Sequence, residues 1–229
     1  MLEWEQVMPM NRFDTVLFDL DGTLVDSNEV IIRSYAHAFS TVLPDVFVSR
    51  EDIIRQIGPP LHAIFGRYTH EADIVEKLVQ TYRRHYVEHE TGLTRPYPDV
   101  ETVLHTLAEA DVQTAIVTTK LAEAAWPVIR RYGFDDCIDT FVFLDDVSCP
   151  KPDPEPVFLA LSRFGRVGEA VMVGDNQGDL LAARNAGIAC AGVAWSIKGE
   201  AHLAEVEPDI MLRSMKDLLD YVDFSGKEL

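Results

Sequence analysis

The feature that most constrains the fold of this chain is a set of short, continuously apolar runs that recur along it. Runs of this length without polar alternation are typical of parallel strands buried on both faces of a sheet. Stretches with helical periodicity separate them, such as residues 99–110, where apolar residues fall on one stripe. Strands that alternate with helices predict an α/β protein with a doubly wound (Rossmann-like) parallel sheet. The predicted strands are residues 15–20, 113–118, 138–143, 170–174 and 188–193.

One long interval breaks this alternation. Residues 28–95 have apolar residues at helical spacing but no buried strand, and the sequence "TRPYPDV" closes the interval with two prolines. We therefore expect a small helical cap over residues 28–95, inserted after the first strand, between core segments 1–27 and 96–229. In the core, Asp99 is expected to cap a helix, and Pro127 should either kink or restart the helix that contains it.

Polar side chains follow three of the predicted strands. Asp19 and Asp21 come at the end of the first strand, "VTTK" (residues 117–120) ends the second, and Asp175 and Asp179 follow the strand at 170–174. In a doubly wound sheet, ligands bind at the carboxyl ends of the strands. We therefore expect these side chains to lie around one site.

The residue types at this site indicate phosphoryl chemistry. An oxygen-rich site without His or Cys suits Mg²⁺, and a carboxylate beside Mg²⁺ can attack phosphorus to form an aspartyl-phosphate. Cations and hydrogen-bond donors around the phosphoryl oxygens then stabilise the transition state. In this interpretation Asp19 attacks and Asp175 shares the metal. Thr118 donates a hydrogen bond, and Lys151, from the proline-rich stretch "SCPKPDPEP", neutralises charge.

Each of these motifs also has a purely structural explanation. Asp and Gly are ordinary turn residues, so Asp19 and Asp21 could form an acidic turn. Lys151 could be a surface lysine in a proline-rich loop, and threonines such as Thr118 and Thr119 are common in strands. The motifs together favour the chemical interpretation, because two buried aspartates are unfavourable unless a cation compensates their charge.

The charge of the chain limits its partners. A formal net charge of −18 argues against nucleic acid and against anionic membranes, which would repel the chain. Residues 28–95 hold eight basic and nine acidic residues, a net of −1, so the rest of the chain carries −17. Either the helix faces of residues 28–95 are solvated with mixed charge, or the cap brings positive groups to an anionic ligand.

Other features indicate a cytoplasmic protein. Its three cysteines are odd in number and lack CxxC spacing, as expected for reduced thiols. No apolar run approaches the length of a membrane span, and the first residues lack the pattern of a secretory signal. The sequence leaves the oligomeric state open.

Four motifs together resemble those of a known family. "DLDGTLVDS", "VTTK", "KPDPEP" and "GDNQGD", in this order, look like the motifs of the haloacid dehalogenase-like hydrolase superfamily. The helical insertion is similar to the C1-type cap of its phosphoglycolate phosphatase branch. Within that branch, "IGPPLHAIF", "LDDVSCPKPDPEPV" and "AGVAWSIKG" most resemble the PpaX-type inorganic pyrophosphatases.

The resemblance implies roles for the carboxylates. Asp19 would be the nucleophile and Asp21 the general acid and base, protonating the leaving group and later deprotonating the attacking water. Mg²⁺ would be held by the Asp19 side chain, the Asp21 backbone carbonyl and Asp175, with Asp179 in support. The presence of Asp21 argues against a dehalogenase, because the dehalogenase pattern lacks an aspartate at that position.

The resemblance also implies how the substrate is held. Thr118 would bind the phosphoryl oxygens, Lys151 would bridge them to Asp19, and Gly22 would let the backbone approach the phosphate. Thr119 stands where phosphoglycolate phosphatases commonly have Asn, which argues against that narrower substrate.

The expected partner is a small anionic phosphorylated substrate, first of all inorganic pyrophosphate. The alternative is 2-phosphoglycolate or another small phosphomonoester, and a phosphomutase or a non-catalytic regulatory module would also keep this fold. Pyrophosphate brings roughly three to four negative charges, so its leaving phosphate needs donors from the cap or from Lys120. Arg55 and His62, which flank the turn at residues 58–60, are the cap candidates. Further candidates are Arg33, Arg67 and Arg84.

Overall fold

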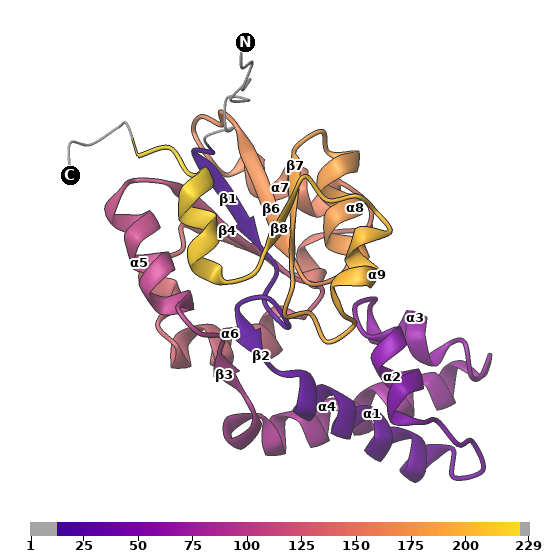
Figure 1. Cartoon of the computed structure of the whole chain (residues 1–229). Coiled ribbons are helices and arrows are strands. Elements are labelled where there is room, and N and C mark those ends of the chain that lie inside the picture. The colour runs from indigo at the N-terminus through magenta and orange to yellow at the C-terminus, as the bar shows by residue number, and fades with distance from the viewer. Residues whose placement is uncertain (1–12, 225–229) are drawn as a thin grey trace, which may run out of the picture.

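The computed structural model describes residues 13–224 of the chain (Figure 1). Residues 1–12, which include the stretch for which the sequence predicted no secretory signal, lie outside the described residues, as do residues 225–229. Within the described range, no helix is both long and apolar enough to cross a membrane.

A parallel sheet forms the centre of the protein. In the described residues it has six strands, and each strand runs parallel to its neighbours. The chain winds outward from β1 first in one direction and then in the other, which confirms the predicted doubly wound topology. In spatial order the strands are β5 (Thr140–Val142), β4 (Gln113–Val117), β1 (Thr15–Phe18), β6 (Ala170–Gly174), β7 (Ala189–Val193) and β8 (Ile210–Leu212).

Helices cover both faces of the sheet, and the continuous apolar runs explain why. Val16 and Phe18 of β1 pack with α5 and α6 on one face, whereas Leu17 packs with α7 and α8 on the other. Because successive side chains of a strand point to opposite faces, a strand buried on both sides needs an uninterrupted apolar run. The covering helices are α5 (Val100–Glu109), α6 (Ala122–Arg131), α7 (Glu155–Ser162), α8 (Gln177–Asn185), α9 (Glu200–Ala204) and the 3-10 helix Met215–Tyr221.

A separate group of helices lies between two very short strands, β2 (Val25–Asp26) and β3 (Arg95–Pro96), which pair in antiparallel fashion. These helices bury a cluster of apolar side chains of their own, mostly from the facing helices α1 and α4. Figure 1 shows the group at one end of the molecule, with β2 and β3 between it and the sheet. Its helices are α1 (Asn28–Val42), α2 (Arg50–Gln56), α3 (Leu61–Phe65) and α4 (Ala72–Leu93), which we call the helical segment.

Two details differ from what the sequence predicts, and a third excludes one of two alternatives that the sequence left open. The sequence analysis missed β8, a strand at the edge of the sheet in which only Leu212 is fully buried. Asp99 precedes α5, but its φ of 66° is left-handed and its side chain forms no cap; the carboxylate instead pairs with Lys216 at 2.7 Å. Pro127 lies inside α6, which continues through it to Arg131, so the helix does not restart there.

Candidate active site

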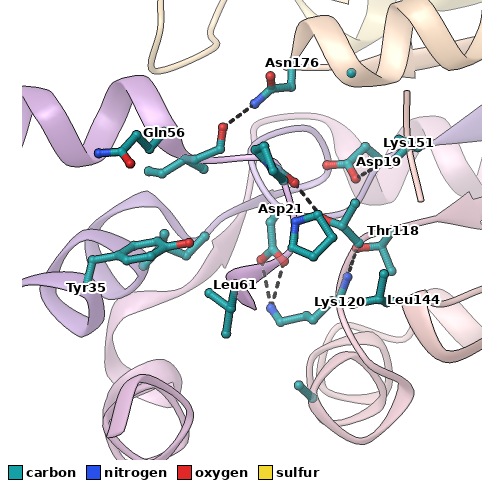
Figure 2. A pocket seen from close by; sticks show the side chains of 18 of the residues that line it. Asp19, Asp21, Tyr35, Gln56, Leu61, Thr118, Lys120, Leu144, Lys151 and Asn176 are labelled. Atoms are coloured by element: carbon teal, nitrogen blue, oxygen red, sulfur yellow. Dashed lines mark hydrogen bonds and ion pairs between the residues drawn. The ribbon is translucent and has the colours of Figure 1, made fainter. Parts of the chain in front are cut away.

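A cavity of about 830 Å³ lies between the carboxyl ends of the central strands and the helical segment. The strands β4, β1 and β6 are neighbours in the sheet, so the loops that follow them converge on this cavity. The residues that the sequence analysis proposed for the site line the cavity, with the exceptions of Gly22 and Arg33. Figure 2 shows the cavity with Asp19, Asp21, Thr118, Lys120 and Lys151 around it.

Lys151 joins two of the predicted carboxylates. Its Nζ lies 2.7 Å from Asp19 Oδ1 and 2.6 Å from Asp179 Oδ1, and it also donates to the Val117 carbonyl at 2.8 Å. The Lys151 side chain is only 4% exposed. Burial lowers the pKa of Lys151, but the attraction of Asp179 and Asp19 outweighs burial, so its pKa is raised above its ordinary range. Lys151 is therefore a buried ammonium at working pH rather than a surface lysine.

Asp175 is a buried carboxylate without such compensation. Asp175 is only 5% exposed, yet its side chain takes part in no ion pair or hydrogen bond in the described part of the chain. Oxygens of Asp19, Asp175 and Asp179 all lie within 4.8 Å of one another. Three buried carboxylates that share one lysine leave uncompensated negative charge, and oxygen ligands without His or Cys are what Mg²⁺ prefers. The donor set fits a magnesium ion.

Burial and the neighbouring carboxylates also raise the pKa values of Asp19 and Asp175. Burial raises the pKa of Asp19 to about 7, against the opposing charge of Lys151 and with help from Asp179. The pKa of Asp175 is also raised well above its ordinary range, mainly by burial and to a smaller extent by repulsion from Asp19 and Asp179. A cation that replaced the lost water would relieve both effects.

Two glycines make room for the carboxylates. Gly22 has a φ of +88°, and a Cβ there would lie 2.3 Å from Asp175 Oδ2. At Gly174, the last residue of β6, a Cβ would lie 2.3 Å from the Asp179 Cβ. Asp179 also accepts the Asn176 N–H at 3.0 Å, which caps α8 and fixes the orientation of its carboxylate.

Asp21 is held by a different lysine from the one that binds Asp19. Lys120 Nζ lies 2.9 Å from both oxygens of Asp21, and the Ser27 hydroxyl donates to Asp21 Oδ1 at 2.6 Å. Lys120 Nζ also donates to the Tyr86 hydroxyl of α4 at 2.7 Å. Thr118 is buried next to this group, and its hydroxyl accepts the Lys120 N–H at 3.2 Å. Each of the two aspartates thus has its own ammonium partner.

Three donors from the sheet side hold the turn that follows α2. The Ile57 carbonyl accepts from Asn176 Nδ2 at 2.8 Å and from Lys198 Nζ at 2.7 Å. The next carbonyl, that of Gly58, accepts from the Thr119 hydroxyl at 3.0 Å. These donors come from the loops after β6, β7 and β4, so the sheet binds the helical segment at residues that adjoin the carboxylates.

Arg55 and His62 line the cavity, as the sequence analysis expects of substrate contacts, but both already have partners. Arg55 pairs with Asp52 of the same helix, and His62 Nε2 lies 3.1 Å from Glu76. Both side chains are more than half exposed. Their contact with substrate remains a prediction.

Sequence reasoning missed Lys198, Asn176 and the tyrosines of the cavity wall. Lys198 follows β7, the fifth predicted strand, so its place after the carboxyl end of a strand is a sequence signal for it. The hydroxyl of Ser196 in the same loop donates to the Asp175 carbonyl at 2.7 Å. The tyrosines lie on buried helix faces, where nothing in the sequence separates them from ordinary core residues.

Comparison with known proteins adds a family. Residues 16–193 match the family model described as haloacid dehalogenase-like hydrolase. A relative from Halalkalibacterium halodurans named "Pyrophosphatase PpaX" is 45% identical over 217 residues, which cover 94% of this chain and all of that protein.

Solved structures agree on the fold. A haloacid dehalogenase-like family hydrolase from Streptococcus pneumoniae superposes with a TM-score of 0.76 at 26% identity, and the match covers 90% of this chain and 97% of that one. A predicted phosphoglycolate phosphatase from Haemophilus somnus superposes with a TM-score of 0.81 at 25% identity, covering 92% of this chain and 98% of that one.

Proposed function

This chain belongs to the haloacid dehalogenase-like hydrolases, and on that premise we propose that it hydrolyses inorganic pyrophosphate in a reaction that depends on Mg²⁺. The observation that carries the proposal is the pair of aspartates with separate lysines. Asp19 is bound to Lys151 and Asp21 to Lys120, and both aspartates face one cavity. One carboxylate can then act as nucleophile while the other handles the proton.

In the first step Asp19 attacks the nearer phosphorus. A bond forms between its carboxylate oxygen and phosphorus, the bridging P–O bond breaks, and the leaving phosphate takes the bridging electron pair. Asp21 supplies a proton to that oxygen. Lys151 stays beside Asp19 and offsets negative charge on the transferred phosphoryl group. The Thr118 hydroxyl donates a hydrogen bond to an oxygen of the same group.

In the second step water completes the reaction. Asp21, now unprotonated, takes a proton from a water that attacks the phosphorus of the aspartyl-phosphate, and Asp19 is released as a carboxylate. We assign Mg²⁺ to Asp19, Asp175 and the Asp21 backbone carbonyl, with Asp179 in support; when bound, it would neutralise phosphoryl oxygens and orient them. Gly22 leaves space for the Asp175 carboxylate.

We further propose that the helical segment acts as a cap over the phosphoryl site. The Ile57 and Gly58 carbonyls are bound by the sheet side, which brings the turn at residues 58–60 next to Asp175. A cap of this kind excludes bulk water from the aspartyl-phosphate. Arg55 and His62 remain candidates for binding the distal part of the substrate.

Two observations favour pyrophosphate as the substrate. The match with the relative named "Pyrophosphatase PpaX" covers the whole length of that relative and 94% of this chain. In addition, phosphate is a better leaving group than the alkoxide of a phosphomonoester, so its departure depends less on protonation by a general acid. This suits Asp21, whose carboxylate is paired with Lys120. The solved structure titled as a predicted phosphoglycolate phosphatase makes 2-phosphoglycolate the second candidate.

Steady-state phosphate release decides between the two substrates. The purified chain is assayed with pyrophosphate, 2-phosphoglycolate and other small phosphomonoesters, with Mg²⁺ or with chelator. We expect kcat/KM to be highest for pyrophosphate and activity to be lost in chelator. A kcat/KM for 2-phosphoglycolate about tenfold above that for pyrophosphate, a difference of about 1.4 kcal/mol in transition-state binding, would assign the second candidate instead.

The mechanism has its own test. Asp19→Asn keeps the volume of the side chain but removes the nucleophile, so turnover should fall by several orders of magnitude while the protein stays folded. Acid quenching of the wild-type enzyme with labelled substrate should leave phosphate on Asp19. Label on a serine or histidine would contradict the assignment.

A further inference from the structure

Three tyrosines of the helical segment line the cavity on the side opposite the sheet. Tyr35 comes from α1, and Tyr82 and Tyr86 come from α4. Their rings pack together, with centroids 4.7 Å apart for Tyr35 and Tyr82 and 6.2 Å apart for Tyr82 and Tyr86. The three residues are only 4%, 8% and 4% exposed. Packing alone would explain the rings but not their hydroxyl groups.

The hydroxyls of Tyr35 and Tyr82 have no protein partner. Across residues 13–224, neither oxygen makes a hydrogen bond, although both residues line the cavity. Other tyrosine hydroxyls do have partners, such as that of Tyr68 with Gln56. Neither oxygen is among the buried side-chain atoms that lack a hydrogen-bond partner, so both hydroxyls are open to the cavity rather than enclosed in the packed core. Phenylalanine at either position would keep the ring packing, so the two hydroxyls give the cavity donors that the packing does not require.

The place of these hydroxyls indicates which part of a ligand they meet. Figure 2 shows the Tyr35 hydroxyl directed from the helical segment toward Asp21. Burial, with repulsion from Asp21 among the further causes, raises the pKa of Tyr82 well above its ordinary range. Burial raises the pKa of Tyr35 above its ordinary range as well. Both phenols therefore keep their protons and lie on the side of the cavity where Asp21 would protonate the leaving group.

We propose that Tyr35 and Tyr82 form a leaving-group subsite that binds the distal oxyanion of the substrate, a terminal phosphate, through two neutral O–H donors. This inference rests on the proposed function and names residues that bind the half of pyrophosphate that departs. Tyr86 extends the subsite, because its oxygen accepts from Lys120 and its own proton is left to donate.

Binding without turnover tests the subsite directly. In an Asp19→Asn background, isothermal titration calorimetry in Mg²⁺ compares pyrophosphate with ethyl phosphate, whose tail carries no acceptor. We expect Tyr35→Phe and Tyr82→Phe each to weaken pyrophosphate binding about tenfold or more, because a hydrogen bond to a charged group is lost. Ethyl phosphate binding should not change. Tyr68→Phe is the control, because it removes a hydroxyl from the same helical segment outside the cavity wall.

The outcomes separate this inference from the proposed function. Unchanged pyrophosphate binding in both cavity variants, or an equal loss for ethyl phosphate, would refute the subsite. If Asp19→Asn with intact tyrosines binds pyrophosphate no better than ethyl phosphate, the proposed function fails instead. The subsite is then judged with 2-phosphoglycolate, whose carboxylate offers the acceptors: weaker binding in Tyr35→Phe and Tyr82→Phe supports it, and unchanged binding refutes it. Equal melting temperatures establish that all variants are folded.

Discussion

Replacing Asp175 with Asn should make the metal-free protein more stable and should remove most of its stabilisation by Mg²⁺. In metal-free protein the Asp175 carboxylate is buried, has no ion pair among the described residues, and lies within 4.8 Å of Asp19 and Asp179. Asn keeps the size of the side chain but removes its charge. A change at a buried polar residue that raises stability is unusual, which makes the prediction informative.

The expected size follows from the geometry. Two like charges about 4.8 Å apart repel by about 3.5 kcal/mol at an effective dielectric constant of about 20. Asp175 has two such neighbours, and attraction to Lys198 and Lys151 offsets part of the repulsion. We therefore expect Asp175→Asn to raise the free energy of unfolding by about 3 kcal/mol in chelator at pH 8. For a chain of this length that is a rise in melting temperature of about 6 to 12 °C.

Thermal unfolding with chelator and with Mg²⁺ measures both effects. A ligand at about 100 times its Kd stabilises the native state by about 2.7 kcal/mol, and Asp175→Asn should lose most of that increment. Asp179→Asn is the matched control. It makes the same chemical change but removes partners of Lys151 and of the Asn176 N–H, so it should destabilise the protein in chelator. If Asp175→Asn melts below wild type in chelator, or keeps the full response to Mg²⁺, the carboxylates are not the uncompensated cluster described above.

Three further predictions concern the loop docking and the titration of the site. Gly58→Ala should raise KM and lower the free energy of unfolding by about 1–3 kcal/mol, as kinetics and melting curves would show. The reason is that Gly58 has a φ of +125° and that a Cβ there would lie 2.4 Å from Asn176 Nδ2. Lys198→Met removes one of two donors to the Ile57 carbonyl and should raise KM about tenfold with the fold intact, as steady-state assays would show. Without metal, the stability of wild type relative to Asp19→Asn should be highest below about pH 4 and should fall as pH rises to 7, because Asp19, with an ordinary pKa of 3.8, has a folded-state pKa of about 7 and the native state alone keeps the proton. Denaturant melts of both proteins across this range measure the difference.

Local patterns in the sequence were enough to predict most of the core. Apolar runs identify β1, β4, β6 and β7, because a strand buried on both faces cannot alternate; the edge strand β5 was predicted from the more polar run at residues 138–143. Parallel strands also end at one edge of the sheet, so the residues that follow them could be grouped before their positions were known. Asp19, Thr118 and Asp175 lie together in the structure for this topological reason.

The partners of those residues were decided only by the tertiary structure. Lys120 and Asp21 are 99 positions apart, and Lys120 meets Tyr86 across the boundary between the sheet and the helical segment. Whether a cavity tyrosine bonds to a neighbour or leaves its hydroxyl free depends on how two elements pack, which periodicity does not record. Sequence patterns report which face of one element is buried, whereas ion pairs and unpartnered donors depend on side-chain distances between elements, and only the folded chain sets those distances.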